Sequence, residues 1–350
     1  MLIYLLIIIG IILSIIGIIF IRPISELLGA EEYMMNDCVI YGTVLLVSLT
    51  AFFLQNCFQS FLVVAEKPQM GLTISILVGI ANIFLDFLFI YVFKMGVFGA
   101  ALATAISQFI GGMFPLLYFS MENDTPLKLV KAKFDAKVIL KTCTNGSSEM
   151  VTNVSLSLVN ILYNMQLMKY VGSHGVVAYG IIMYVGFIFI GIYLGYSIGS
   201  APIIGYNYGA KNKEELSNLF KKSLKIITIT SIVLTLIAEI LSKALASVFV
   251  SYDTELLDIT TNAIRIYSLS YLISGINIFT SSFFTALNNG LVSAVISFLR
   301  TLLFQVVMIY ILPIILEING IWFAVVFAEV LALIVSVFCL VFNRKKYGYA

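Results

Sequence analysis

Long apolar stretches, most of them 20 residues or more, alternate with short polar connections along the chain. A helix needs about 20 apolar residues to cross the hydrocarbon core of a bilayer, and it satisfies its own backbone hydrogen bonds there. The pattern therefore predicts an all-α integral membrane protein with ten transmembrane helices. These run over 2–21, 38–64, 70–93, 97–120, 142–168, 176–204, 226–250, 263–287, 291–316 and 320–342.

Basic residues gather at three places between or after these spans. The clusters are Lys128, Lys131, Lys133, Lys137 and Lys141; Lys211, Lys213, Lys221, Lys222 and Lys225; and Arg344, Lys345 and Lys346. With ten alternating spans all three fall on one side, which the positive-inside rule makes cytoplasmic. The acidic connection around Asp253 then lies outside. We expect a multi-pass protein of the cell (plasma) membrane with both ends of the chain in the cytoplasm. The stretch 211–225 predicts an amphipathic surface helix that leads into the next span, or a solvated connector that anchors the topology.

The longest polar interruption, 121–141, divides the chain. We expect an N-terminal lobe over 1–120, a cytoplasmic linker over 121–141, a C-terminal lobe over 142–342 and a cytoplasmic tail over 343–350.

An internal repeat relates the two lobes. A shift of 221 residues superimposes Gly99 on Gly320 and Ala103 on Ala324, and both copies keep the same orientation, which predicts a parallel repeat. The spans 142–168 and 176–204 have no counterparts in the first lobe. We therefore expect a fragment that lacks two N-terminal helices, the alternative being an unusual assembly.

Composition narrows the class of protein further. Hydrophobic residues make up 61% and charged residues 11%, which places the chain among membrane proteins, and a formal charge of +2 gives no reason to expect nucleic acid. Cysteines 38, 57, 143 and 339 are scattered, so we expect no bound metal and no resident cofactor. His174 lies in a short loop, where we expect a surface residue.

Two carboxylates lie inside apolar spans, each on a polar helical stripe. Asp86 follows Asn82 by four residues, and Glu149 belongs to a ladder with steps of three and four. The ladder consists of Asn145, Glu149, Asn153, Ser157, Asn160 and Asn164. An ionised acid at the bilayer centre costs about 2.5–3.5 kcal/mol and normally faces an aqueous cavity or a partner. The two acids therefore favour a transporter over a membrane anchor.

Four stretches of the sequence carry a resemblance to a known family. APIIGYNYGAKN (201–212), ISELLGAEE (24–32), NIFLD (82–86) with GVFGAALATAISQ (96–108), and HGVVAYGI (174–181) resemble parts of the multidrug and toxic compound extrusion (MATE) family. The chain is similar to the third to twelfth helices of its members. The resemblance implies a complete fold of twelve helices, in two six-helix lobes that rock around a central cavity, and a protein that is monomeric at full length.

The resemblance also implies roles for particular residues. Asp86, with Asn82 and Thr104, matches the cation-binding site of the first lobe, and Glu149 matches an acidic residue near the start of the seventh helix. We expect efflux of organic, cationic small molecules coupled to H⁺ or to Na⁺ at Asp86. The substrate or a second proton is expected at Glu149, Asn145, Asn153 and Asn160. The span 263–287 lacks the aspartate that some members carry there.

Other charged residues within the spans remain candidates. Glu329 lies mid-span opposite Gln108 in the repeat, Arg300 requires a partner that the sequence does not identify, and Glu239 and Lys243 are spaced as an ion pair on one helix. Alternative functions are a flippase of a lipid-linked saccharide or a truncated remnant without transport activity. An enzyme is not expected, because the sequence lacks HExxH, Walker and GxSxG motifs.

Overall fold

The computed structural model describes residues 1–27, 32–125, 127, 129–130 and 134–349, and this part of the chain is helical without strands. It divides into two compact units, Met1–Ala136 and Lys137–Ala350. The predictions that fall on Gly29, on Lys128, Lys131 and Lys133, and on Ala350 lie outside the described residues.

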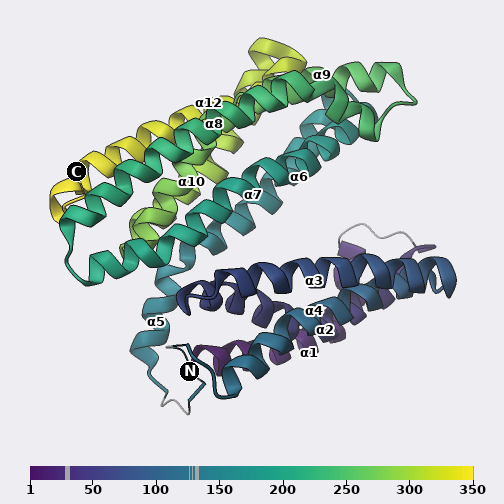
Figure 1. Ribbon diagram of the computed structural model, residues 1–350. Helices are drawn as coiled ribbons and strands as arrows, with labels where there is room; N and C mark the ends of the chain where they lie inside the picture. The colour runs from purple at the N-terminus through teal and green to yellow at the C-terminus, as the bar shows by residue number, and fades with distance from the viewer. Residues whose placement is uncertain (28–31, 126, 128, 131–133, 350) are drawn as a thin grey trace. The chain divides into compact units, whose positions relative to one another are not determined.

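The first unit contains four long helices that lie side by side (Figure 1). They are α1 (Leu2–Leu27), α2 (Met35–Val64), α3 (Pro68–Asp86), which continues as a π-helix η1 (Phe87–Val92), and α4 (Gly96–Ser120). Ile8, Ile12 and Ile19 on α1 are exposed. Such an exposed apolar surface suits contact with lipid, because lipid tails impose no penalty on it.

Small residues bring α2 and α4 together in this unit. Ala101, Ala103 and Ala105 are buried on α4, and a Cβ added to Gly112 would overlap the backbone carbonyl of Ala51 on α2. Close backbone approach at small residues is the usual way helices associate in lipid, where apolar burial adds little.

The second unit begins with the short helix α5, and most of the helices that follow are longer (Figure 1). Its elements are α5 (Ala136–Asn145), α6 (Ser147–Tyr170), α7 (Ser173–Gly209), α8 (Lys213–Phe249), α9 (Thr254–Ser268), α10 (Tyr271–Ala286), α11 (Gly290–Phe298), the π-helix η2 (Leu299–Leu303) and α12 (Phe304–Tyr347). Trp322, Tyr163 and Tyr193 are fully buried in its core.

Among the described residues, seven helical segments are long and apolar enough to cross a membrane. The last of them, Gly290–Tyr347, contains the predicted spans 291–316 and 320–342, between which Glu317 leaves helical geometry at φ 50°. The predicted spans 142–168 and 263–287 correspond to α6 and to α9 with α10, which are not among the seven. The total of ten therefore stays a prediction.

The helix predicted over 211–225 leads directly into the next span, because α8 runs without interruption from Lys213 to Phe249. One predicted boundary needs correction. The predicted span 263–287 is broken, since α9 ends at Ser268 and α10 begins at Tyr271. The boundary between the two compact units falls between Ala136 and Lys137 along the chain, inside the predicted linker. The last residues of that linker are helical.

The internal repeat has a backbone counterpart. Gly96 and Glu317, which the shift of 221 residues superimposes, have φ values of 58° and 50°. At Gly99 and Gly320, three residues further on, an added Cβ would crowd the segment that precedes each helix. The same sharp turn into a tightly packed helix therefore occurs in both units.

Candidate functional site

The strongest charged interaction in the described part of the chain joins Arg300 and Glu329 inside the second unit. Arg300 Nη2 lies 2.7 Å from Glu329 Oε1, and Arg300 Nε donates hydrogen bonds to Oε1 and Oε2 at 2.9 and 3.0 Å. The side chain of Glu329 is 3% exposed and that of Arg300 is 14% exposed. Buried charges persist only when they are paired and hydrogen-bonded, and this pair meets both conditions.

Two neutral side chains extend this ion pair. Asn277 Nδ2 donates to Glu329 Oε2 at 2.7 Å and to the Glu329 carbonyl at 3.0 Å, while Asn277 Oδ1 accepts from the Ser336 hydroxyl at 2.9 Å. Asn277 and Ser336 are both fully buried. The result is a connected polar network between α10, η2 and α12, in which each of these groups is satisfied.

Local backbone geometry positions the ion pair. Arg300 lies on the π-helical turn η2, which interrupts the path from α11 to α12, and Glu329 lies on the second half of α12 beyond the turn at Glu317. The wider turn of a π-helix is frequent at functional sites. The two residues are 29 positions apart, and the chain reversal at Glu317 brings them together.

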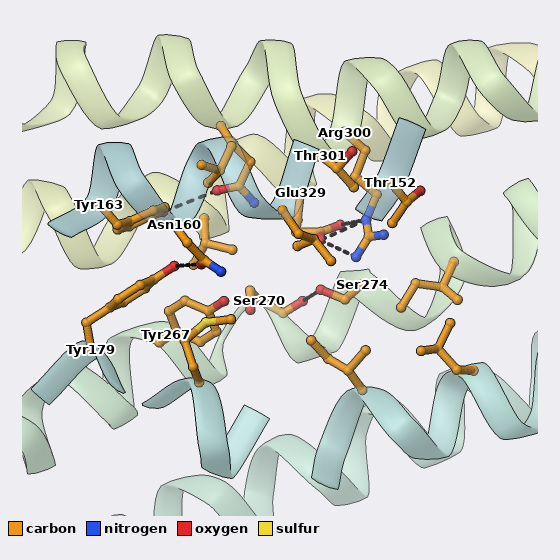
Figure 2. A pocket seen from close by; sticks show the side chains of 18 residues that line it. Thr152, Asn160, Tyr163, Tyr179, Tyr267, Ser270, Ser274, Arg300, Thr301 and Glu329 are labelled. Atoms are coloured by element: carbon orange, nitrogen blue, oxygen red, sulfur yellow. Dashed lines mark hydrogen bonds and ion pairs between the residues drawn. The ribbon is translucent and has the colours of Figure 1, made fainter. Parts of the chain in front are cut away.

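A cavity of about 120 Å³ adjoins the ion pair (Figure 2). Tyr163 and Tyr179 stack in its wall with ring centroids 4.8 Å apart. The Tyr179 hydroxyl donates to Asn160 Oδ1 at 2.7 Å, and the Tyr163 hydroxyl donates to Gln305 Oε1 at 3.2 Å. The other labelled lining residues are Thr152, Tyr267, Ser270, Ser274 and Thr301. The cavity wall is mostly apolar, with these hydroxyl and amide groups and the ion pair as its polar part, and the space is large enough for several water molecules.

The predicted site in the first unit has a different character. Asp86 is half-buried at the end of α3, directly before the π-helix η1, and has no hydrogen bond or ion pair with any described residue. The Nδ2 atom of Asn82 is buried without a partner. Thr104 donates its hydroxyl to the Ala100 carbonyl of its own helix at 3.1 Å, so no hydrogen bond joins it to Asp86 within the described residues.

The predicted ladder around Glu149 is only partly a single helix face. Asn145 ends α5, and Gly146 separates it from α6, so Asn145 does not share a helix with the other members. Glu149 is exposed and accepts a hydrogen bond from Ser148 at 2.7 Å. Asn153 is also exposed and bonds the Glu149 carbonyl, whereas Asn160 is half-buried at the tyrosine cavity.

The remaining candidate residues from the sequence interact with nearby side chains of the protein. Gln108 accepts from the Ser48 hydroxyl at 2.7 Å in the first unit. Glu239 accepts from Ser268 at 3.1 Å and forms no ion pair with Lys243, which corrects the predicted pairing. His174 Nε2 lies 3.7 Å from Asp253 on the surface.

Sequence reasoning missed the partner of Arg300 and most of the cavity wall. One signal was available, because Arg300 and Glu329 are opposite charges in the consecutive spans 291–316 and 320–342. Asn277, Tyr163 and Tyr179 carried no comparable signal, since tyrosine and asparagine are common in these spans.

Comparisons with known proteins agree with this architecture. A family model described as MatE matches residues 1–88 and 149–311, which is more than half of the chain. The multidrug export protein MepA of Staphylococcus haemolyticus is 25% identical over 98% of this chain and 75% of its own length. MepA of Staphylococcus saprophyticus is 23% identical over 90% of this chain and 68% of its own length.

Solved structures show the same fold. An outward-facing multidrug resistance MATE transporter of the MOP superfamily superimposes with a TM-score of 0.92 and 22% identity, over 99% of this chain and 78% of that one. A MOP superfamily transporter from Pyrococcus furiosus gives a TM-score of 0.90 and 21% identity, over 99% and 77%. The predicted all-α membrane fold and the predicted family are confirmed. The chain belongs to the MatE family of multidrug efflux transporters.

Proposed function

We propose that this protein exports organic, cationic small molecules across the cell membrane in exchange for H⁺ or Na⁺. Its two lobes would open alternately to the two sides of the bilayer. The protein requires no resident cofactor, because the exchanged cation supplies the driving force. It acts among membrane lipids as a monomer when full-length, with both ends of the chain in the cytoplasm.

The observation that carries this proposal is the unpaired carboxylate of Asp86. An acid within a membrane span is expensive unless a partner compensates it, and no described residue does so here. The buried Asn82 amide nearby also lacks a partner. A half-buried acid without a fixed counter-charge can bind H⁺ or Na⁺ and release it when its surroundings change.

The substrate would bind at the polar surface of the second lobe. Glu149 and Asn153 are exposed on α6, and Asn160 follows on the same helix, while Asn145 at the end of α5 adds a side chain whose Oδ1 is unpartnered. An exposed carboxylate among amides attracts an organic cation, or it takes up a second proton. A lipid-linked saccharide is a weaker candidate, because the buried cation Arg300 is already neutralised by Glu329.

Replacement of Asp86 by asparagine tests the coupling role. Asp86→Asn removes the ionisable group with little change in shape, so we expect coupled efflux of a fluorescent organic cation from everted vesicles to fall to the background of empty vesicles. Expression should stay intact. Asp258→Asn, at an exposed position on α9, is the matched control and should leave efflux unchanged. Undiminished efflux by Asp86→Asn would contradict the assignment of Asp86 as the coupling residue.

A further inference from the structure

We propose that Arg300 is a tethered cation that permanently fills the carboxylate site of Glu329, so that Glu329 exchanges neither H⁺ nor Na⁺ unless Arg300 is removed. This inference rests on the proposed function, because it concerns which acids take part in cation exchange. It assigns Arg300 as the residue that makes Glu329 inert and leaves exchange to other acids such as Asp86.

The hydrogen bonds of Glu329 leave no position for a mobile ion. Oε1 receives Arg300 Nη2 at 2.7 Å and Nε at 2.9 Å, and Oε2 receives Arg300 Nε at 3.0 Å and Asn277 Nδ2 at 2.7 Å. Both carboxylate oxygens are therefore already occupied by donors. A sodium ion would have to displace a guanidinium that cannot lose its charge.

Asp86 in the first unit provides the contrast. Its carboxylate is half-buried and has no partner among the described residues, whereas Glu329 is 2% exposed and paired on both oxygens. The repeat register sharpens this difference, because position 300 falls on Gly79 and position 329 falls on Gln108. Both members of the ion pair are thus replaced by neutral residues in the first unit.

The adjoining cavity gives a released cation space beside Glu329. Glu329 and Arg300 both line it, together with the hydroxyl-bearing residues Ser270, Ser274 and Thr301 (Figure 2). Besides Arg300 and Glu329, the titratable side chains that line the cavity are tyrosines: Tyr163 on α6, Tyr179 on α7 and Tyr267 on α9. Tyr193 on α7 also interacts electrostatically with Glu329. No second basic residue among the described lining residues could replace Arg300. If the guanidinium is removed, the Glu329 carboxylate and the three hydroxyl oxygens remain beside the cavity, and such oxygen atoms suit H⁺ or Na⁺.

The experiment counts exchangeable cations in the purified full chain in detergent. Bound ²²Na⁺ is measured by equilibrium dialysis against NaCl balanced with KCl, and bound protons are measured by potentiometric titration between about pH 5 and pH 9, a range that brackets shifted carboxyl pKa values. We expect Arg300→Gln to bind one more cation per chain than the unaltered protein. We expect Arg300→Gln/Glu329→Gln and Arg300→Lys to bind the same number as the unaltered protein.

Two results would overturn the inference. If the double variant binds one cation fewer than the unaltered protein, Glu329 already exchanges its ion. If Arg300→Gln folds and binds no more than the double variant, Glu329 is not an exchange site at all. If Arg300→Gln does not fold, the number of cations bound by the double variant, compared with the unaltered protein, tests the inference by itself. The variant Asp86→Asn separates the two proposals. If it binds as many cations as the unaltered protein, Asp86 is not the proposed coupling site, and the Arg300 variants still test the inference about Glu329.

Discussion

Asn277 and Asn56 show how the surroundings of one residue type determine its effect. The shift of 221 residues superimposes them, yet Asn277 is fully buried and joins Glu329 to Ser336, while Asn56 is exposed and bonds only the Phe52 carbonyl of its own helix. A buried polar group that loses its partner bears the full cost of desolvation, whereas an exposed group can turn to other partners. The same residue is therefore a structural link in one unit and a surface residue in the other.

Substitution of Asn277 by alanine should lower the free energy of unfolding by about 1–3 kcal/mol, because Glu329 Oε2 and the Ser336 hydroxyl lose a buried partner. The matched substitution Asn56→Ala should change the free energy of unfolding by no more than about 0.5 kcal/mol. Thermal unfolding of the purified variants in detergent measures both. Equal shifts for the two variants would contradict the assigned difference in their roles.

The role of the Arg300–Glu329 ion pair is best tested by removing both charges together. Loss of one partner from a buried ion pair typically costs about 3–5 kcal/mol, whereas replacement of both is often tolerated. This difference is why the double variant of Arg300 and Glu329 is the informative one for cation counting, and why a single loss of Glu329 would leave a buried guanidinium without its partner.

At the scale of elements, small residues and local breaks in helical geometry decide how the helices pack. The α2–α4 contact depends on Gly112, where a Cβ would overlap the Ala51 carbonyl. Two π-helical turns, η1 after Asp86 and η2 around Arg300, lie next to the candidate charged residues. Glu317 adopts a positive φ that favours glycine, as its repeat counterpart Gly96 does.

Addition of a single methyl group at Gly112 should separate α2 from α4. We expect Gly112→Ala to lower the free energy of unfolding by about 1–3 kcal/mol, since overpacking forces the helices apart. Gly79 on α3 has open space around its Cβ position, so Gly79→Ala should be neutral or stabilising by up to about 1 kcal/mol. Thermal unfolding in detergent compares the two, and a stable Gly112→Ala would argue against close backbone contact there.

At the scale of the whole molecule, two helical units are each built around their own core, and their charges predict how they cross the membrane. The basic clusters around 211–225 and 344–346 are expected on the cytoplasmic side, and the connection near Asp253 on the outside. Retention of basic loops in the cytoplasm orients a multi-span protein regardless of the chemistry of its sites.

Cysteine labelling in intact cells tests this orientation. In a background in which Cys38, Cys57, Cys143 and Cys339 are changed to serine, we expect Tyr252→Cys to react with a membrane-impermeant maleimide and Lys345→Cys to stay unlabelled until the cells are lysed. Both positions are exposed, so accessibility within the protein is matched. Labelling of Lys345→Cys in intact cells would place the C-terminal end outside and contradict the predicted topology.

Local features of the sequence are enough to predict the class of protein, the positions of most helices and the family. Apolar length and helical periodicity are local properties, because each span satisfies its own backbone and needs no distant contact to form. The same locality identified Asp86, Glu149, Arg300 and Glu329 as unusual within apolar spans.

How the charges of these residues are compensated depends on contacts between distant parts of the chain. The pairing of Arg300 with Glu329 and Asn277 requires three elements to meet at one depth, through the turn at Glu317 and the π-helical turn η2. Such contacts depend on helix rotation and packing, which the hydrophobic pattern of a nearly all-apolar helix leaves open. For the same reason the sequence did not reveal the break at Leu269 and Ser270, nor that Asp86 has no partner among the described residues while Glu329 is paired on both oxygens.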